Sequence, residues 1–235
     1  MTMQAYFFDM DGTLFDSMPH HAQAWDEVTR RHGLSFTPQE CYREEGRTGI
    51  DILQEIFRRE QKKGNPTEID TLGPDEQLAH IRAVYQEKSA RFKELGPIMP
   101  VKGAYELLQY LHALPGTQIW IVTGSAQQSL FRQLDDAFPG IFTRERMITA
   151  DDVRHGKPSP EPYLTAWQRT GLPKSDCCVI ENAPLGVRSA KAAGLFTYAV
   201  NTGNLPVSAL QQEGADCVVG NMAQLLQIIS KTHTL

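Results

Sequence analysis

The chain has 235 residues, of which 41% are hydrophobic and 22% are charged. These values exclude collagen-like, coiled-coil and wholly disordered chains. A chain of this length can bury on the order of 70% of the surface of its unfolded form, which suits one large domain or a domain with an insert.

The charge balance and the apolar runs restrict the partners. There are 23 Lys and Arg residues against 28 Asp and Glu, and because no long basic run occurs, we expect no nucleic-acid partner. Apolar runs such as 119–122 are far shorter than the ~20 residues that span a bilayer, and the start of the chain lacks a basic signal region. We expect a cytoplasmic protein with no membrane partner. The four cysteines form no C-x-x-C motif, so we expect buried, reduced thiols.

Short apolar runs alternate with longer amphipathic stretches, which is typical of βα units and a mainly parallel sheet. The predicted strands are 6–8, 119–122, 147–149, 177–180, 197–200 and 217–219. The predicted helices among and after the later strands are 161–169, 185–193, 207–213 and 222–230. The pattern predicts an α/β fold.

The first strand is followed by a gap of roughly a hundred residues without a convincing strand, far beyond the usual crossover length. An inserted helical domain explains this gap. Its predicted helices span 20–31, 50–63 and 75–94, and glycines suited to C-terminal caps follow them at Gly33, Gly64 and Gly96. We predict an insert of residues 17–95 in a core domain formed by residues 1–16 and 96–235.

Two acidic residues follow the first predicted strand, at Asp9 and Asp11, and Gly12 comes next. Side chains two apart on an extended segment share a face, so both carboxylates can converge at the carboxyl edge of the sheet, where α/β sheets bind ligands. Such a pair holds a cation, or works as nucleophile and proton donor, or does both. The alternative is a turn with solvated aspartates.

The segment DMDGTLFDS, residues 9–17, resembles the first motif of the haloacid dehalogenase superfamily of phosphotransferases, D-x-D-G-[TV]-[LIV]. The other three motifs are similar to IVTGS, GKPSPEPY and VIENAPLGVRSAKAAG, and they occur in the family's order. The helical insert resembles the cap of the β-phosphoglucomutase-like subfamily. The resemblance covers essentially the whole chain, and it implies a Rossmann-like parallel sheet core with an inserted helical cap domain.

The resemblance and the chemistry of the residues assign the same catalytic roles. Asp9 would attack phosphorus and form an aspartyl-phosphate. Asp11 would protonate the leaving oxygen and later take a proton from water, so we expect its pKa to be raised by Asp9. Thr123 and the amides of Gly124 and Ser125 would hold phosphoryl oxygens. The alternative for Thr123 is a simple strand end.

Lys157 would neutralise both Asp9 and the phosphate. On its own it would be a solvated loop residue, and only the ordered set of motifs raises it above that alternative.

The fourth motif departs from the commonest form, because Glu181 and Asn182 stand where two acidic residues are usual. Mg²⁺ prefers oxygen ligands, and Asp9, the Asp11 carbonyl, Glu181 and the Asn182 amide can supply them. One negative charge is missing, so we expect weaker Mg²⁺ binding unless a carboxylate of the cap compensates. The alternative is a degenerate site that no longer binds metal.

The insert offers further candidates for substrate contact. The sequence EEGRTG predicts a flexible charged loop that carries Glu45 and Arg47. Lys88 falls on the apolar stripe of the long helix 75–94, where it is either a snorkelling lysine or a cation for an anionic substrate. His21 contacts the substrate or belongs to the hinge, while Trp25 is expected in the core.

The cap also bears on the reaction. β-Phosphoglucomutases carry an Arg and a Ser three residues apart for the distal phosphate, and alignment through LQEIF places Gly49 and Ile52 there. EEGRTG resembles instead a branch that includes inorganic pyrophosphatases. We therefore predict a monomeric, Mg²⁺-dependent phosphohydrolase of a small phosphorylated compound, with pyrophosphate as the leading candidate. The alternatives are a sugar-phosphate mutase or phosphatase, and a non-catalytic sensor of phosphorylated ligands.

Overall fold

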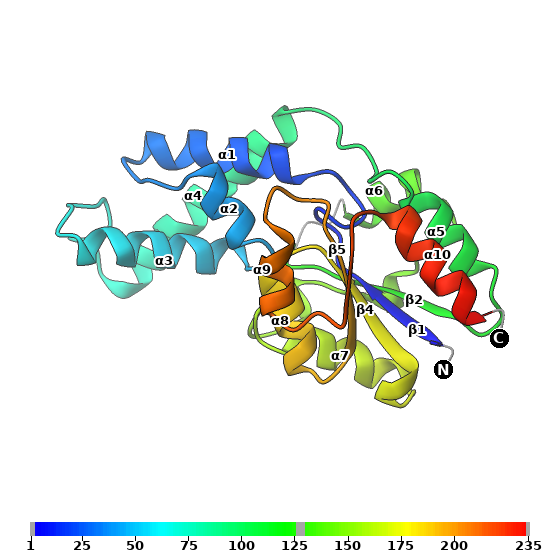
Figure 1. Ribbon diagram of the computed structural model, residues 1–235. Coiled ribbons are helices and arrows are strands. Elements are labelled where there is room, and N and C mark those ends of the chain that lie inside the picture. Colours follow the sequence, from blue (N-terminus) through cyan, green and yellow to red (C-terminus); the bar gives the residue numbers. More distant parts are fainter. Residues whose placement is uncertain (1–2, 126–129, 234–235) are drawn as a thin grey trace.

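The computed structural model describes residues 3–125 and 130–233, which form a parallel sheet flanked by helices and a helical insert above one end of it (Figure 1). The strands are β1 (Ala5–Phe8), β2 (Gln118–Val122), β3 (Met147–Ile148), β4 (Cys177–Glu181), β5 (Phe196–Val200) and β6 (Cys217–Val219). All pairings are parallel, in the order β3-β2-β1-β4-β5-β6. The six predicted strands and the α/β fold are confirmed.

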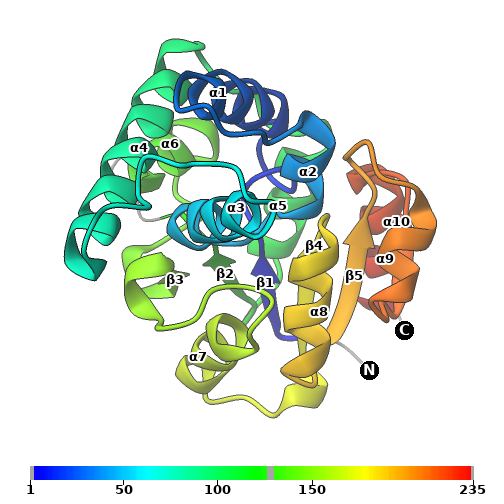
Figure 2. The same ribbon diagram turned by 90° about the vertical axis from the view of Figure 1, so that its left-hand side faces the viewer.

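Helices cover both faces of the sheet, as Figure 2 shows. They are α5 (Ala104–His112), α6 (Leu130–Ala137), α7 (Glu161–Thr170), α8 (Pro184–Ala192), α9 (Val207–Gln212) and α10 (Met222–His233). Tyr6 and Phe8 of β1 pack with residues of α5, α6 and α10, whereas Ala5 and Phe7 pack with residues of α7 and α8. The alternation of side chains along β1 thus supplies two hydrophobic cores, which explains why all four of its residues are apolar and buried.

The register of the central strands aligns their carboxyl ends. Phe8 pairs with Ile121 on one side and with Ile180 on the other. The residues that come next in each strand therefore lie at one edge of the sheet. They include Asp9, Thr123 and Glu181.

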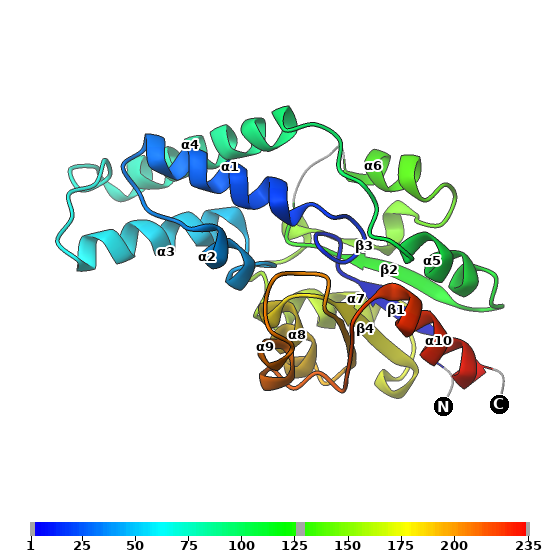
Figure 3. The same ribbon diagram turned by 45° about the horizontal axis from the view of Figure 1, so that its top comes forward.

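The insert consists of α1 (Met18–Arg31), α2 (Pro38–Arg43), α3 (Gly49–Lys62) and α4 (Pro74–Glu94), and Figure 3 shows α1 and α4 side by side. Its apolar side chains form a separate cluster that includes Trp25, Ile56 and Val84. The predicted glycines after the three long helices all have positive φ. The inserted helical domain is confirmed as part of the fold, and its exact boundaries at residues 17 and 95 stay a prediction.

Three helices in the described part of the chain were not predicted. Helix α2 is six residues long and depends on a capping box between Thr37 and Glu40, while α5 and α6 follow glycine- and glutamine-containing stretches with weak start signals. Three short 3₁₀ turns, among them Ala150–Asp152, also escaped prediction.

No helix in residues 3–125 and 130–233 is long and apolar enough to cross a bilayer. All four cysteines are free; Cys41, Cys177 and Cys178 are buried, whereas Cys217 is only partly buried because it lies on the edge strand β6. The prediction of buried thiols is therefore wrong for Cys217.

Candidate active site

Lys157 joins the carboxyl ends of three strands. Its Nζ donates hydrogen bonds to Asp9 Oδ1 at 2.5 Å, to Glu181 Oε1 at 2.7 Å and to the carbonyl of Val122 at 3.0 Å. The side chain is only 1% exposed and lies over the ring of Tyr163. The structure thus brings Lys157 into a buried ion-pair network, and the alternative of a solvated loop lysine is wrong.

Both oxygens of Glu181 have partners. Oε1 also accepts a hydrogen bond from the Tyr163 hydroxyl at 2.7 Å, and Oε2 accepts from the backbone N–H groups of Asn182 and Ala183 at 3.0 and 3.3 Å. Tyr163 is a site residue that sequence reasoning missed, although it ends the quoted GKPSPEPY segment. These contacts hold the Glu181 side chain in place, and Glu181 in turn positions the Lys157 ammonium.

Asp9 is almost completely buried, with 4% of its surface exposed, directly after β1. Burial raises the pKa of Asp9 to about 7; Lys157 opposes this rise, and Glu181 and Asp11 add to it. Since Oδ1 is bound by Lys157, the second carboxylate oxygen is the one available to a ligand.

Asn182 connects the core to the insert. Its Oδ1 accepts a hydrogen bond from the Thr13 hydroxyl at 2.8 Å, and its Nδ2 donates to Glu45 Oε1 at 2.6 Å. Glu45 is 7% exposed. Burial raises the pKa of Glu45 well above its usual value, with further contributions from Asp9 and Glu181, while the hydrogen bond from Asn182 lowers it. A cap carboxylate therefore lies directly beside the position where the fourth motif lacks its second acid.

Asp11 makes different contacts from those of Asp9. The Ser17 hydroxyl donates to its Oδ1 at 2.6 Å, and His21 Nε2 lies 3.3 Å from the same oxygen. Burial acts to raise its pKa, yet His21, Ser17 and Lys88 together bring the pKa of Asp11 below its ordinary value. The prediction that Asp9 would raise this pKa is wrong, because hydrogen-bond donors of the insert stabilise the carboxylate.

Lys88 of α4, which is buried, and His21 of α1, which is partly buried, form a pair within the insert. Lys88 Nζ lies 2.6 Å from His21 Nδ1 and 5.1 Å from the ring centres of Trp25 and Phe92. As the ammonium can only donate, the Nε2 of a neutral His21 carries the proton that faces Asp11. Burial lowers the pKa of Lys88 to about 8. With 4% exposure, Lys88 is not a snorkelling lysine.

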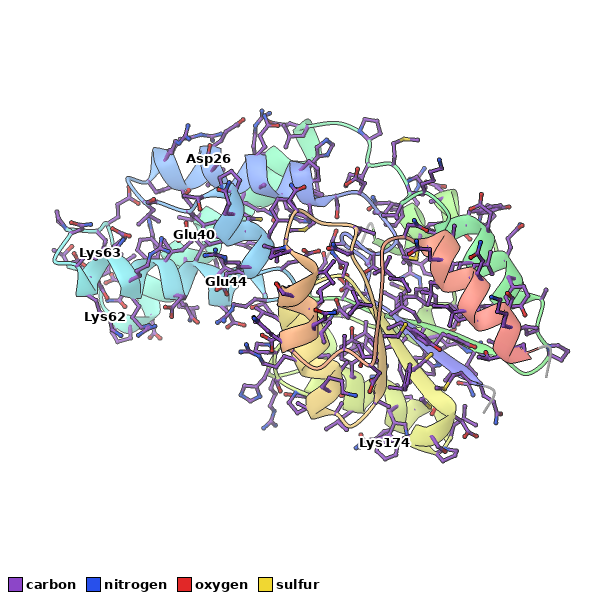
Figure 4. The ribbon with its side chains drawn as sticks, in the orientation of Figure 1. Asp26, Glu40, Glu44, Lys62, Lys63 and Lys174 are labelled. Carbon is purple, nitrogen blue, oxygen red and sulfur yellow. The ribbon has the colours of Figure 1, made fainter. Side chains whose placement is uncertain are left out.

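A cavity of about 70 Å³ lies between the sheet edge and the insert. Its walls include the predicted residues Asp9, Asp11, His21, Glu45, Arg47, Lys88, Gly124 and Ser125. Arg47 is paired with Glu44 at 2.6 Å on the rim. Figure 4 labels Glu44 on the part of the insert that approaches the core.

The loop of residues 44–49 packs against the core, so the prediction of a flexible, unpacked loop is wrong. A Cβ on Gly124 would lie 2.9 Å from the carbonyl oxygen of Gly46, which shows how closely the loop approaches the end of β2. Gly49 begins α3, and a Cβ there would lie 2.0 Å from the Tyr85 ring. Tyr85 therefore fills the space that a side chain at position 49 would need, and Ile52 lines the same cavity.

Thr123 is buried at the end of β2. Its hydroxyl accepts a hydrogen bond from the Ser125 N–H at 3.1 Å, which shapes the turn that carries Gly124 and Ser125 into the cavity wall. Thr123 itself lies beneath this wall. Ser17 and Thr13, which sequence reasoning did not select, hold Asp11 and Asn182, although both belong to the first motif.

The residues fit a hard divalent cation. Asp9 and Glu181 share one ammonium, that of Lys157, and Glu45 is a third buried carboxyl group beside Asn182, so the site carries an excess of negative charge when all three are ionised. Asp9, the Asp11 carbonyl, the Asn182 amide and Glu45 supply the oxygen ligands that Mg²⁺ prefers. Glu181 was also predicted as a Mg²⁺ ligand, but both of its carboxylate oxygens already accept hydrogen bonds from Lys157, Tyr163 and backbone amides.

A family model described as haloacid dehalogenase-like hydrolase matches residues 3–194. The chain belongs to the haloacid dehalogenase-like hydrolases. Among members of this family, hexitol phosphatase A of Escherichia coli is 31% identical over 96% of this chain and 94% of its own length. The fructose-1-phosphate phosphatase of the same organism is 29% identical over 80% of this chain and 91% of its own.

Solved structures of haloacid dehalogenase-like proteins agree. A Bacteroides vulgatus protein that is provisionally named a β-phosphoglucomutase superposes with a TM-score of 0.87 and is 38% identical, covering 99% of this chain and 90% of its own. The chain is therefore an enzyme of a family whose similar members are phosphatases and phosphomutases, and it has the β-phosphoglucomutase-like fold.

Proposed function

We propose that the chain is a Mg²⁺-dependent phosphohydrolase that transfers the phosphoryl group of a compact phosphorylated substrate to Asp9 and then to water. The observation that carries this proposal is the position of Glu45, a buried carboxylate of the insert that contacts Asn182 at the edge of the sheet. With Mg²⁺ bound, its ionised carboxylate would supply the negative charge that the fourth motif lacks, and its side chain limits the room above Asp9.

The residues divide the work of such a reaction. The free oxygen of Asp9 attacks phosphorus and releases the leaving group, and Lys157 holds the other oxygen and neutralises charge. Gly124 and Ser125 lie in the cavity wall, and because the Ser125 N–H is held by the Thr123 hydroxyl, the Gly124 N–H is the backbone donor left for a phosphoryl oxygen as charge develops. When bound, Mg²⁺ supplies further charge stabilisation at the phosphoryl oxygens.

Asp11 acts in the second half of the reaction. Ser17 and His21 hold its carboxylate, which suits removal of a proton from the water that attacks the aspartyl-phosphate. The water oxygen bonds to phosphorus as the bond between Asp9 and phosphorus breaks, which releases inorganic phosphate and restores free Asp9. In the first half, a leaving phosphate is a far weaker base than an alkoxide and needs little proton donation.

Pyrophosphate is the substrate that this geometry favours. The cavity of about 70 Å³ is small, and the side chains of Gly49 and Ile52 offer no hydrogen-bond donor for the distal phosphate of a sugar bisphosphate. Lys88 and Arg47 lie in the walls and provide the cations for the second phosphate.

Phosphorylated sugars and polyols are the second candidate class, and the comparisons favour them. The similar curated proteins include a hexitol phosphatase and a fructose-1-phosphate phosphatase. Substrates of this size require the insert to move away from the cavity, which places Glu45 outside the site.

A screen of phosphate release tests the proposal. Pyrophosphate, hexitol phosphates, fructose 1-phosphate and glycerol phosphates are compared by kcat/KM with Mg²⁺ and with Mg²⁺ removed by a chelator. We expect Mg²⁺-dependent release with the highest kcat/KM for pyrophosphate. A higher value for a hexitol phosphate would select the second class, and faster conversion of β-glucose 1-phosphate to glucose 6-phosphate than any hydrolysis would refute hydrolase action.

A further inference from the structure

A second group of metal-ligating side chains lies at the far end of the insert. His32 follows α1, Glu68 lies in the connection between α3 and α4, and His80 lies on α4. One ligand atom of each residue lies within 4.8 Å of the others. Figure 4 labels Lys62 and Lys63 at this same end, which points away from the sheet. His32 is about 16 Å farther along α1 than His21, at 1.5 Å per residue.

Glu68 is the centre of the group. Its Oε2 lies 2.9 Å from His32 Nδ1 and 2.8 Å from His80 Nε2. His80 Nε2 is shielded from solvent and makes no well-aligned hydrogen bond within the described part of the chain, despite this short approach. The two imidazoles and the carboxylate thus converge on one point, with their rings at 84° to each other.

The other nitrogen of His32 also has an acidic neighbour. His32 Nε2 lies 3.3 Å from Glu87 Oε1, on the next turns of α4. Histidine ligands of metals commonly place their second nitrogen beside a carboxylate, which fixes the ring and increases its basicity. Glu87 therefore occupies the position of such an orienting group.

We propose that His32, Glu68 and His80 bind a divalent transition-metal ion, and that Zn²⁺ is the ion that fits best. Two imidazoles and one carboxylate are a ligand set found in zinc proteins with an open fourth position. In a tetrahedral site with bonds of about 2.0 Å, ligand atoms lie roughly 3.3 Å apart. The observed separations from Glu68 need to grow by only a few tenths of an ångström, and the side chain of Glu68 is 46% exposed and can shift.

The backbone around the ligands is held in place without a metal. Ile69, next to Glu68, is buried in the core of the insert, and Gln77 Nε2 donates to the carbonyls of Ile69 and Leu72. The ring of His80 packs edge-on against buried Phe57. The ligands are thus presented by fixed elements, and the ion would tie α1 and α4 to the connection between α3 and α4.

The alternative is an ion-pair network that contains a proton instead of a metal. Burial lowers the pKa of His32, but Glu68 and Glu87 outweigh it and raise this pKa above its usual value. The same negative charge that retains the proton attracts a cation, so a direct measurement must separate the two.

The test is a Zn²⁺ titration of the full chain after removal of metals by a chelator, with a chromogenic zinc indicator as competitor and millimolar Mg²⁺ present. Wild type is compared with Glu68→Gln, His80→Gln and the control His112→Gln, which removes a histidine from the core domain. We expect one Zn²⁺ bound by wild type and the control, and an affinity at least tenfold lower in both ligand variants. Zn²⁺ should raise the Tm of wild type but not that of His80→Gln, while Mg²⁺-dependent phosphate release stays the same in all four proteins.

Two results would overturn the proposal. Equal Zn²⁺ affinity in all four proteins would place the ion elsewhere, for example among the carboxylates around Asp9. No binding by wild type would leave an ion-pair network only. Circular dichroism checks the fold of each variant, and if His80→Gln is unfolded, Glu68→Gln decides because its side chain is exposed.

Discussion

The substitution Glu45→Ala should affect kcat/KM differently for pyrophosphate and for larger substrates. Glu45 Oε1 accepts a hydrogen bond from Asn182, and its carboxylate faces the cavity above Asp9. Alanine removes this charge and enlarges the cavity. We expect a large loss of kcat/KM for pyrophosphate and a small change for hexitol phosphates. The larger substrates are hydrolysed while the insert is open, and Glu45 then lies outside the site.

The expected magnitude follows from the contact. A hydrogen bond to a charged group in a protein contributes about 1.5–3 kcal/mol. If this contact forms fully only with the insert closed over the transition state, its loss lowers kcat/KM for pyrophosphate by roughly tenfold to hundredfold. Glu45→Gln keeps the size of the side chain but not its charge, so most of the loss should remain.

The assay measures kcat/KM of wild type, Glu45→Ala and Glu45→Gln for pyrophosphate and a hexitol phosphate at saturating Mg²⁺. Glu55→Gln is the matched control, because Glu55 is a solvent-facing glutamate of the insert paired with Arg58. An equal loss for both substrates in Glu45→Ala would contradict the reasoning, as it would show that Glu45 acts in the site with large substrates as well as with compact ones.

Three further outcomes are expected. Asp9→Asn abolishes phosphate release, because an amide is a poor nucleophile, but leaves Tm unchanged or higher, because it removes one of the crowded buried carboxyls; retained turnover would refute the nucleophile assignment. Asn182→Asp lowers the Mg²⁺ concentration for half-maximal activity because it adds a carboxylate at the site. It also reduces the preference for pyrophosphate, because the hydrogen bond from Asn182 to Glu45 is replaced by two carboxylates that face each other. An unchanged Mg²⁺ titration would mean that Asn182 does not contact the ion. Because burial lowers the pKa of Lys88 to about 8, its positive charge is present below that pH and lost above it, so kcat/KM falls above pH 8 in wild type; in Lys88→Met the value is lower throughout and this fall disappears, and an identical pH profile in the variant would exclude Lys88 as its source.

The sheet and the residues at its carboxyl edge could be predicted from the sequence. The strands are continuous apolar runs because both of their faces are buried, and this pattern is visible without a structure. In a parallel sheet the strand order and register then bring Asp9, Thr123 and Glu181 to one edge. Asp9 was predictable for this reason, whereas Thr123 and Glu181 were selected through the resemblance of their motifs to those of the haloacid dehalogenase superfamily.

The contacts between the insert and the core were harder to predict from the sequence. The sequence EEGRTG is charged and contains two glycines, which usually indicates an exposed loop. Its packing depends on tertiary contacts, namely Glu45 with Asn182 across 137 positions of sequence and Gly46 against Gly124. No local pattern encodes such a contact.

The pKa of Asp11 shows the same difficulty. Its nearest acidic residue in the sequence, Asp9, suggests a raised value, whereas Ser17 and His21 at the start of the insert supply donors that reverse the direction. The cluster of His32, Glu68 and His80 also arises only when α1, α4 and the connection before α4 come together.

The central claim is that Asp9 becomes phosphorylated during turnover. Wild type is mixed with pyrophosphate or a hexitol phosphate and Mg²⁺, quenched in acid within milliseconds to seconds, and digested, and the peptide that contains Asp9 is analysed by mass spectrometry. The account predicts a transient phosphoryl group on Asp9 that forms and decays at rates no slower than kcat and is absent in Asp9→Asn. Phosphate release without any phosphoryl group on Asp9 at any time would contradict it, and binding of these compounds with neither release nor phosphorylation would favour a sensor.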